Sequence, residues 1–526
     1  LFLLSLFLRA SHASSPLAMN WSSQAYGPDG PWQAVDIAVG SNGQHVALYP
    51  GATGYTSTIL MASLCTNTSL SATCYAAQAG VYNASESTTA FVLDVSGWET
   101  TYWAVEGGSV EGVLGDEVSV GNDQFVPNVS FTAIYQTYET YPNGKSYPVS
   151  VGNLALGAPY TSDEISSNTT LNLLASYLYS SGGESGIPSY SYGMHIGSAT
   201  PSIPGSLILG GYDRSRALSP ISAQSVSLAS ATGGELPITL KDIALGVAEG
   251  ESPFPFTSKS GLFTGYSTQS VTVDPTKPYL YLPEDTCDAI TSSLPVSFNS
   301  SFGLYLWDTT ASDYENITTS PSYLSFTFTK DDVDNQNITI KIPFSLLTLT
   351  LEAPLVDANT TYFPCFYDDT PVLGRAFLQA AFVAVNYHDG DNTGTWFLAQ
   401  APGPGISTST DVTAMSVSQT SLTGSNSSWE DSWASTWHVL GATTTGSSNS
   451  TTNSTTPATS KKDSGLSSGA KIGLGVGLGV GGAILIAAAV FLALLIRKRK
   501  QGILLGSRQT SPTHDRKQPF RGIVEI

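Results

Sequence analysis

Short apolar runs separated by glycine, proline and small polar residues make up most of the chain between positions 14 and 400. Residues 32–48, for example, form a β-rich run that Gly40-Ser41-Asn42-Gly43 interrupts with the composition of a hairpin turn. Runs of this length, bounded by turn residues, predict strands. Residues 171–180 are the clearest helix candidate. We therefore predict a mostly β, largely antiparallel body in two halves, over about 32–204 and about 205–400.

Three later segments carry the same strand signature. Residues 108–121 have turn glycines that frame two short alternating strands, and residues 205–213 are an apolar strand between glycine turns. Residues 371–387 contain Leu373-Gly374, then a short helical turn over 375–379 and a strand over 380–387. These segments extend the strand prediction across both halves of the body.

The stretch at 271–283 reads V-T-V-D-P-T-K-P-Y-L-Y-L-P. A β-branched run ends at Asp274, a tight polar turn follows, and a second apolar run ends at Pro283, which opens a helical segment over 284–293. A strand that delivers an Asp to a turn and returns at once presents that side chain at the end of a sheet. Asp274 is therefore the first candidate site residue, and its simplest alternative role is to cap the backbone amides of its own turn.

Composition agrees with many short strands, because the chain has 50 Gly and 29 Pro but only 12% charged residues. Residues 497–526 hold eight Lys/Arg and two Asp/Glu, a net charge of +6, so the remainder of this −20 chain carries −26. Such an acidic body argues against nucleic-acid binding. The histidines and cysteines show no metal-like spacing, so we predict no metal site and no cofactor.

The C-terminal region has the pattern of a membrane anchor. Residues 472–496 are 25 residues without a charge, followed by Arg497-Lys498-Arg499-Lys500. At about 1.5 Å per residue they span a bilayer core of ~30 Å, and the basic cluster places the tail at 497–526 in the cytoplasm. A buried core helix is the alternative, but the preceding residues 401–471 are Ser/Thr-rich and typical of a disordered, O-glycosylated stalk. Within the stalk, three tryptophans recur every four residues and could form one contact face, namely Trp429, Trp433 and Trp437.

The N-terminal residues 1–13 combine an apolar run with a small-residue patch. They are typical of a signal peptide whose start is incomplete, and a buried first strand is the alternative. Export agrees with the Asn-x-Ser/Thr sequons, which stop before the apolar segment at 472–496. The sequons are Asn20, Asn67, Asn83, Asn128, Asn168, Asn299, Asn316, Asn337, Asn359, Asn426, Asn449 and Asn453. We predict a single-pass type I protein of the cell membrane, with an extracellular, glycosylated ectodomain over 14–400.

The motifs, taken in order, resemble those of the pepsin-like aspartic peptidases. The stretch at 271–283 resembles the active-site loop of that family, whose pattern is apolar-apolar-Asp-Thr/Ser-Gly-Thr/Ser, and residues 108–121 are similar to its flap hairpin and the strand that follows. The other matching motifs are Gly40-x-x-x-Gln44-x-Val46, Leu154-Ala155-Leu156-Gly157, residues 205–213 and Leu373-Gly374-x-x-Phe377-Leu378. The resemblance implies a bilobal double β-barrel with a cleft between its lobes, and the disulfides Cys65–Cys74 and Cys287–Cys365.

The resemblance also shows where this chain departs from the family. By register the first catalytic Asp falls at Gly51, and no Asp occurs between Asp36 and Asp94. Asp274 holds the second catalytic position, but Pro275, Thr276 and Lys277 replace the residues that follow it. Pro275 has no N–H and no hydroxyl to offer a second carboxylate, and Lys277 is close enough in sequence to neutralise Asp274. The flap tyrosine of the family falls near Val105, and Tyr102 is the nearest tyrosine.

Aspartic proteolysis needs two carboxylates that share a proton and a water, one acting as base and the other as acid. With one of the two missing, whether the chain is an enzyme is uncertain, and the balance is against it. We expect an inactive homologue that acts as a surface binding or sensing module, with a peptide or glycan ligand in the interlobe cleft. The alternative is a membrane-anchored aspartic endopeptidase that cleaves surface or secreted proteins. The sequence does not determine the oligomeric state.

Overall fold

The computed structural model of the chain describes residues 14–52, 56–66, 68–157, 162–166, 169–180, 186–227, 234–265, 268–388, 393–406 and 409–441. All of them belong to one compact unit that ends at Thr444. The predicted signal peptide at 1–13, the apolar segment at 472–496 and the tail at 497–526 lie outside the described residues. None of the helices in the described part of the chain has the length and apolar character needed to cross a bilayer.

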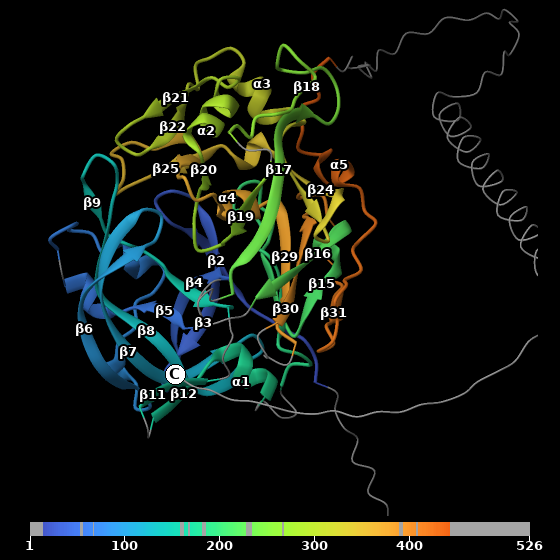
Figure 1. Ribbon diagram of the computed structural model, residues 1–526. Coiled ribbons are helices and arrows are strands. Elements are labelled where there is room, and N and C mark those ends of the chain that lie inside the picture. Colours follow the sequence, from blue (N-terminus) through green and yellow to red (C-terminus); the bar gives the residue numbers. More distant parts are fainter. Residues whose placement is uncertain are drawn as a thin grey trace, which may run out of the picture. The chain divides into compact units, whose positions relative to one another are not determined.

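The body is mostly β, as the sequence predicts (Figure 1). The N-terminal half forms an eleven-stranded sheet in the order β11-β12-β8-β5-β10-β4-β3-β7-β6, with β2 beside β3 and β9 beside β8. The bounds of its strands are β2 Trp21–Tyr26, β3 Trp32–Val39, β4 Gln44–Gly51, β5 Ser57–Leu60, β6 Phe91–Tyr102, β7 Glu106–Val120, β8 Gln124–Thr140, β9 Ser146–Tyr147, β10 Gly152–Ala155, β11 Ser162–Ser166 and β12 Thr169–Asn172. The helix α1, Leu174–Ser180, follows this sheet.

The C-terminal half forms an eight-stranded sheet and a four-stranded one. The first has the order β24-β23-β17-β19-β28-β20-β27 with β18 beside β17, and the second has the order β21-β22-β26-β25. The bounds are β17 Leu236–Val247, β18 Ser258–Lys259, β19 Gln269–Val273, β20 Leu280–Leu282, β21 Val296–Asn299, β22 Leu304–Trp307, β23 Ser322–Lys330, β24 Val333–Pro343, β25 Leu349–Leu351, β26 Thr360–Phe363, β27 Cys365–Tyr367 and β28 Val372–Leu373. Three short helices accompany them: α2 Glu284–Thr291, α3 Tyr314–Thr319 and α4 Arg375–Leu378.

A six-stranded sheet joins segments that are distant in the sequence, in the order β1-β14-β13-β29-β30-β16. A separate pair is formed by β15 and β31. The bounds are β1 Leu17–Ala18, β13 Ser191–His195, β14 Ser206–Leu209, β15 Gly211–Asp213, β16 Leu218–Ser227, β29 Ala381–Asn386, β30 Thr393–Gln400 and β31 Val412–Ala414. Single 3₁₀ turns are Ala62–Thr66, Tyr75–Gln78, Ala84–Glu86, Arg214–Arg216 and Phe344–Leu346, and the last helix is α5, Trp429–Trp433.

The two halves repeat one arrangement of three strands. In the N-terminal half, β10 lies between β4 and β5, parallel to the first and antiparallel to the second. In the C-terminal half, β28 lies between β19 and β20, parallel to β19 and antiparallel to β20. In both places a later strand is inserted between two strands that follow each other in the chain. The end of β4 and the end of β19 therefore occupy corresponding places in the two halves.

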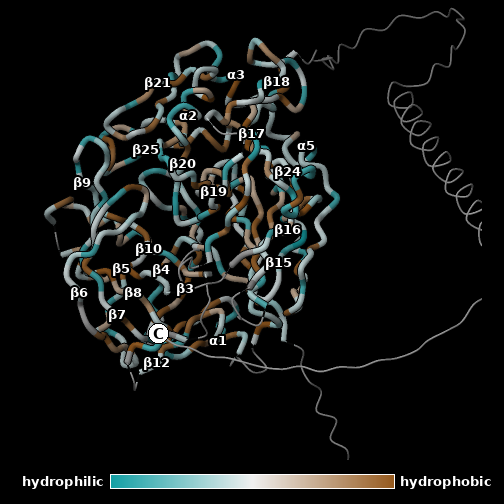
Figure 2. Tube along the Cα trace, in the orientation of Figure 1, coloured by the Kyte–Doolittle hydropathy of each residue, from teal (hydrophilic) through white to brown (hydrophobic). Residues whose placement is uncertain are grey.

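The structure corrects three boundaries. Residues 108–121 were predicted as two short strands, but β7 runs without interruption because it pairs with β6 on one side and β8 on the other. The predicted helix at 171–180 begins only at Leu174, since the preceding residues pair in β12. The predicted strand at 205–213 divides into β14 and β15 at Gly210, whose φ of +71° favours glycine. Figure 2 shows hydrophobic and hydrophilic positions intermixed along the body, and residues 35–39 of β3 alternate between buried and partly exposed, as a sheet with one buried face requires.

Both predicted disulfides are confirmed. Cys65 is bonded to Cys74, and Cys287 of α2 is bonded to Cys365 of β27. No free cysteine occurs in the described part of the chain, and the sequence has only these four. Paired cysteines are consistent with a secreted or extracellular protein. The predicted glycosylation sites that are described also lie at accessible positions, because none of these asparagines is buried: Asn20, Asn83, Asn128, Asn299, Asn316, Asn337, Asn359 and Asn426.

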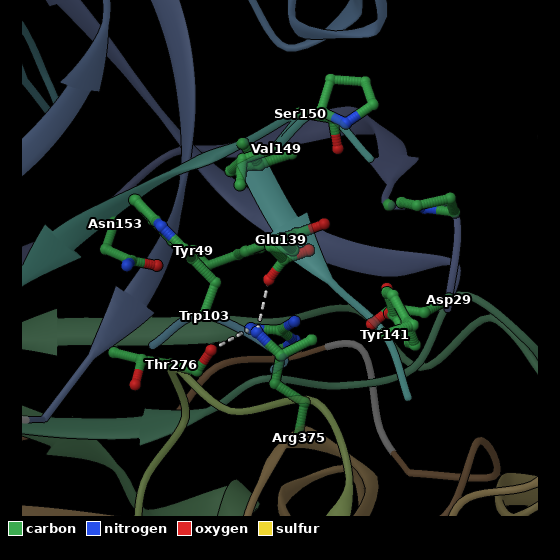
Figure 3. A pocket seen from close by; sticks show the side chains of 15 residues that line it. Asp29, Tyr49, Trp103, Glu139, Tyr141, Val149, Ser150, Asn153, Thr276 and Arg375 are labelled. Carbon is green, nitrogen blue, oxygen red and sulfur yellow. Dashed lines mark hydrogen bonds between the residues drawn. The ribbon is translucent and has the colours of Figure 1, made fainter. Parts of the chain in front are cut away.

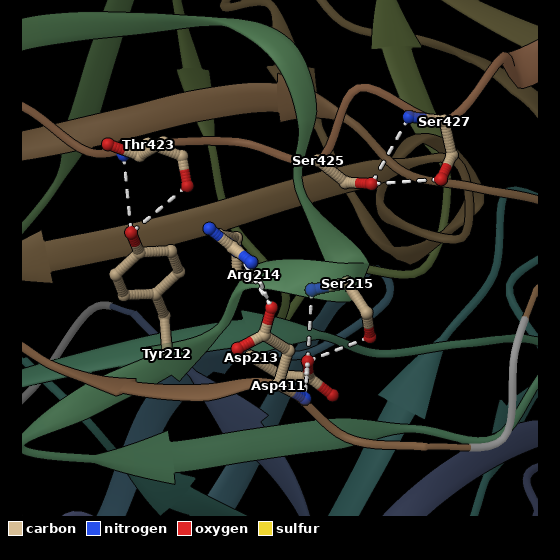
Figure 4. Close-up of polar contacts among 8 residues, drawn as sticks. All are labelled: Tyr212, Asp213, Arg214, Ser215, Asp411, Thr423, Ser425 and Ser427. Carbon is tan, nitrogen blue, oxygen red and sulfur yellow. Dashed lines mark hydrogen bonds and ion pairs between the residues drawn. The ribbon is translucent and has the colours of Figure 1, made fainter.

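The prediction that the stalk begins at 401 is wrong for the described residues of 401–441, which we call the C-terminal strap. The strap packs on the body through β31, which pairs with β15. Next to this pair, Asp411 donates its amide to Asp213 and forms an ion pair of 2.6 Å with Arg214 (Figure 4). Tyr212 donates its hydroxyl to the carbonyl of Thr423 at 3.0 Å. The remaining residues of the predicted stalk, 442–471, lie outside the described residues.

The three tryptophans explain why the C-terminal strap folds in spite of its polar composition. Trp429 and Trp433 of α5 are buried, and Trp437 packs against both, with ring centroids 5.3 and 6.1 Å apart. Burying large aromatic rings contributes enough to offset the chain entropy of the small polar residues around them. The predicted contact face therefore exists, but it attaches the strap to the body.

Candidate functional site

Asp274 follows the last residue of β19 and is 8% exposed. Its amide donates to the carbonyl of Leu373 in the neighbouring β28, which fixes the position of the backbone. Its Oδ1 accepts hydrogen bonds from the amide of Thr276 at 2.9 Å and from the hydroxyl of Thr276 at 2.8 Å. Pro275 has no N–H to donate, so the amide comes from the next residue. The carboxylate thus caps its own turn, the alternative role that the sequence favours.

Gly51 ends β4, opposite Ala155 of β10, and its carbonyl accepts a hydrogen bond from Leu156 at 2.8 Å. The preceding Tyr49 and the turn residue Thr276 line one cavity, so the end of β4 approaches the turn that contains Asp274. Residues 51–56 are Gly-Ala-Thr-Gly-Tyr-Thr. This stretch of the sequence therefore contains no Asp and no Glu.

Arg375, the first residue of α4, is the side chain that enters this space, and it is only 5% exposed. Its Nη1 donates to the carbonyls of Pro275 and Thr276 at 3.1 and 2.9 Å. Its guanidinium lies 4.2 Å from the ring centroid of Tyr49 (Figure 3). It also lies 5.1 Å from the ring centroid of Trp32. A cation between two rings and two carbonyls is held rigidly. Arg375 therefore ties α4 and the turn after β19 to the strands of the N-terminal half.

Two carboxylates line the same cavity as Arg375, namely Asp29 and Glu139. Asp29 is buried and accepts a hydrogen bond from the indole N–H of Trp32 at 3.0 Å. The cavity has a volume of about 40 Å³, which holds one or two water molecules. A peptide or a glycan does not fit there as long as the surrounding side chains keep these positions.

The turn that joins β6 to β7, residues 102–105, closes this space from outside, and we call it the hairpin tip. Lys277 donates its ammonium to the carbonyls of Tyr102 and Trp103 at 2.7 and 2.9 Å. Tyr281 donates its hydroxyl to the carbonyl of Ala104 at 2.6 Å. The two side chains that hold the hairpin tip thus come from the segment around β20. The sequence predicts Lys277 as a neutralising partner of Asp274. In the structure its ammonium donates to the hairpin tip, and the charge of Asp274 acts on its pKa.

Glu139 near the end of β8 accepts the amide of Ala104 at 2.6 Å, which adds a third anchor for the hairpin tip (Figure 3). Burial raises the pKa of Glu139 to about 7, with a further increase from Asp29, while the hydrogen bond from Ala104 and the charges of Lys277 and Arg375 act against it. Burial also lowers the pKa of Lys277, against the attraction of Asp274 and Glu139. A carboxylate that titrates near neutrality is a candidate for proton exchange.

Glu139→Gln is expected to remove a pH dependence of stability. The folded chain holds the Glu139 proton up to pH about 7, whereas the unfolded chain releases it near 4.5. Stability from this group is therefore present below pH 4.5 and is lost as the pH rises to 7, by about 2 kcal/mol for a side chain that is not fully buried. Denaturant unfolding at pH 4.5 and 7.5 measures this difference. Between these two pH values the free energy of unfolding of the wild type should fall by that amount more than the free energy of unfolding of Glu139→Gln. Equal changes in the two chains would show that Glu139 does not hold the proton.

The sequence identified Asp274 and Gly51 but missed Arg375, Asp29 and Glu139. For Arg375 a weak signal exists, because it is a charged residue directly after Leu373-Gly374, at a variable position of that motif. Asp29 and Glu139 are distant in sequence from Asp274, and no local pattern marks them. Protein-family models and curated proteins were compared with the chain, and neither gives a match. The resemblance to the aspartic peptidases therefore rests on the motifs of this chain and on its strand arrangement.

Proposed function

We propose that the body has the bilobal fold of the pepsin-like aspartic peptidases. The order of the sequence motifs supports this proposal, and so does the three-strand arrangement that occurs once in each half. Each copy of that arrangement brings one strand end toward the cavity where the two halves meet. Gly51 is the last residue of the first of these strands, and Asp274 directly follows the second.

We propose further that the protein does not cleave peptide bonds and acts as a binding or sensing module at the cell surface. The observation that carries this proposal is the lack of any Asp or Glu in residues 51–56 at the end of β4 and after it, while the Arg375 guanidinium, a cation, lies against the carbonyls of the turn of Asp274. A guanidinium cannot accept a proton, and without a carboxylate from the loop after β4 the pair that acts as base and acid in one step is incomplete. Disulfides, sequons and the apolar segment at 472–496 support an anchored, extracellular body. A peptide or glycan ligand would require the hairpin tip to lift or would bind outside it.

The test is digestion of an unfolded protein substrate by the purified full chain, measured from pH 3 to 7 beside an active aspartic peptidase. We expect no cleavage above the background of the buffer. Two variants make a positive result interpretable. Cleavage that is lost in Asp274→Asn, and that a transition-state-mimicking inhibitor blocks, would establish the alternative function, a membrane-anchored aspartic endopeptidase. Cleavage that is lost in Glu139→Gln but not in Asp274→Asn would place the chemistry on a different carboxylate.

A further inference from the structure

The strand β6 is the outermost strand of the eleven-stranded sheet and carries the hairpin tip at its end (Figure 1). In the described part of the chain it pairs with β7 alone, so its outward amides and carbonyls up to Thr101 are available for another strand, while the carbonyl of Tyr102 at its end accepts a hydrogen bond from the ammonium of Lys277. Residues 96–100 are all exposed, and two large aromatic side chains are unusually so, Trp98 at 56% and Tyr102 at 65%. Natural proteins usually protect an edge of this kind with charge, proline or bulges.

In β6, irregular pairing of the kind that protects a sheet edge occurs only in the first part of the strand. The pairing of β6 with β7 shifts register between Leu93 and Val95 and again between Val95 and Trp98. From Trp98 to Tyr102 the pairing is regular, and this five-residue segment contains a single charge, Glu99. Trp98 and Tyr102 stand four positions apart, so their side chains point to the same face of the sheet. The unprotected part of the edge is thus short, regular and aromatic.

We propose that this segment pairs with the same segment of a second copy of the chain, antiparallel and around a two-fold axis at Thr100. In this register Trp98 of each copy stands opposite Tyr102 of the other, which makes two cross-strand aromatic pairs on one face. Glu99 stands opposite Thr101, so the acidic side chains do not oppose each other. The edge is therefore complementary to itself in both shape and charge.

Neighbouring registers are less favourable for physical reasons. An axis at Glu99 places the two carboxylates directly opposite each other, which destabilises a strand pair. An axis at Trp98 runs the pairing into the register shift before that residue. An axis at Thr101 requires Trp103 to pair, but β6 ends at Tyr102 and the hairpin tip is held by Lys277. A five-residue edge buries little area, so the dimer is weak and depends on concentration.

Disulfide cross-linking tests the register. All four native cysteines are bonded, so Thr100→Cys introduces the sole free thiol of the full chain. Residues directly opposite in an antiparallel pair lie about 4.5–5.5 Å apart between their Cα atoms, within the reach of a disulfide. Thr101→Cys is the matched control. In the proposed register residue 101 of one copy stands opposite residue 99 of the other, so the two introduced cysteines lie too far apart to form a disulfide. We expect Thr100→Cys to give a covalent dimer at least about tenfold faster than Thr101→Cys under mild oxidation.

A second substitution separates this contact from association through other parts of the chain. Adding Trp98→Glu to Thr100→Cys should slow the cross-link about tenfold or more, since an aromatic anchor is replaced by a charge in both copies. Trp98 is mostly exposed, so circular dichroism should show an unchanged fold. Equal rates for Thr100→Cys and Thr101→Cys would overturn the proposal. So would a rate that Trp98→Glu leaves unchanged, and the edge would then be assigned to a different partner.

Discussion

Replacing Arg375 with alanine is expected to lower the free energy of unfolding by about 3–5 kcal/mol. The side chain is buried and donates to the carbonyls of Pro275 and Thr276 while it packs between Tyr49 and Trp32. Alanine leaves both carbonyls without this donor and removes a positive charge that offsets the nearby carboxylates. The cavity beside them would also grow by most of the volume of the side chain.

Arg214→Ala is the matched control for this experiment. Arg214 also forms an ion pair, with Asp411 at 2.6 Å, but both side chains are about half exposed. Its loss should cost less than about 1 kcal/mol, because water screens an exposed pair and replaces its hydrogen bonds. Denaturant unfolding followed by tryptophan fluorescence measures both variants. A small effect for Arg375→Ala would mean that the two halves are not held together by this guanidinium.

Trp433→Ala is expected to cost a similar amount, about 3–5 kcal/mol. Trp433 is 1% exposed, belongs to the main hydrophobic core of the body and stacks on Trp437. Its indole also covers Gly403 of the strap itself, where a Cβ would come within 2.6 Å of the ring. Removing it leaves a cavity between the C-terminal strap and the body. Because the strap attaches here through α5, we also expect limited proteolysis to cut residues 401–441 earlier in the variant.

Trp98→Ala provides the comparison for the tryptophan experiment. Trp98 is 56% exposed, so its loss should change the free energy of unfolding by less than about 1 kcal/mol in a dilute, monomeric sample. If Trp433→Ala were equally mild, the C-terminal strap would not be part of the cooperative body, and the prediction of a stalk from 401 would regain its support.

The local pattern of the sequence predicted much of the fold. The strand, turn and helix around Asp274 appear as β19, a turn, β20 and α2, because short β-branched runs bounded by turn residues and proline carry a strong local strand signal. The long strand β7 was missed, since its internal glycines resemble turn residues and only its two neighbouring strands keep it extended. The strap was missed because tryptophans separated by polar residues give little local signal.

For the site, the sequence by itself determined that residues 37–93 contain no Asp and only one Glu, Glu86. No folding of the chain can add a carboxylate to the loop after β4, so that conclusion needed no coordinates. Only the tertiary structure decided which charged side chains gather around the turn of Asp274. Arg375, Glu139 and Lys277 lie far apart in the chain, and the contacts that bring them together depend on the packing of whole sheets, which no local pattern encodes.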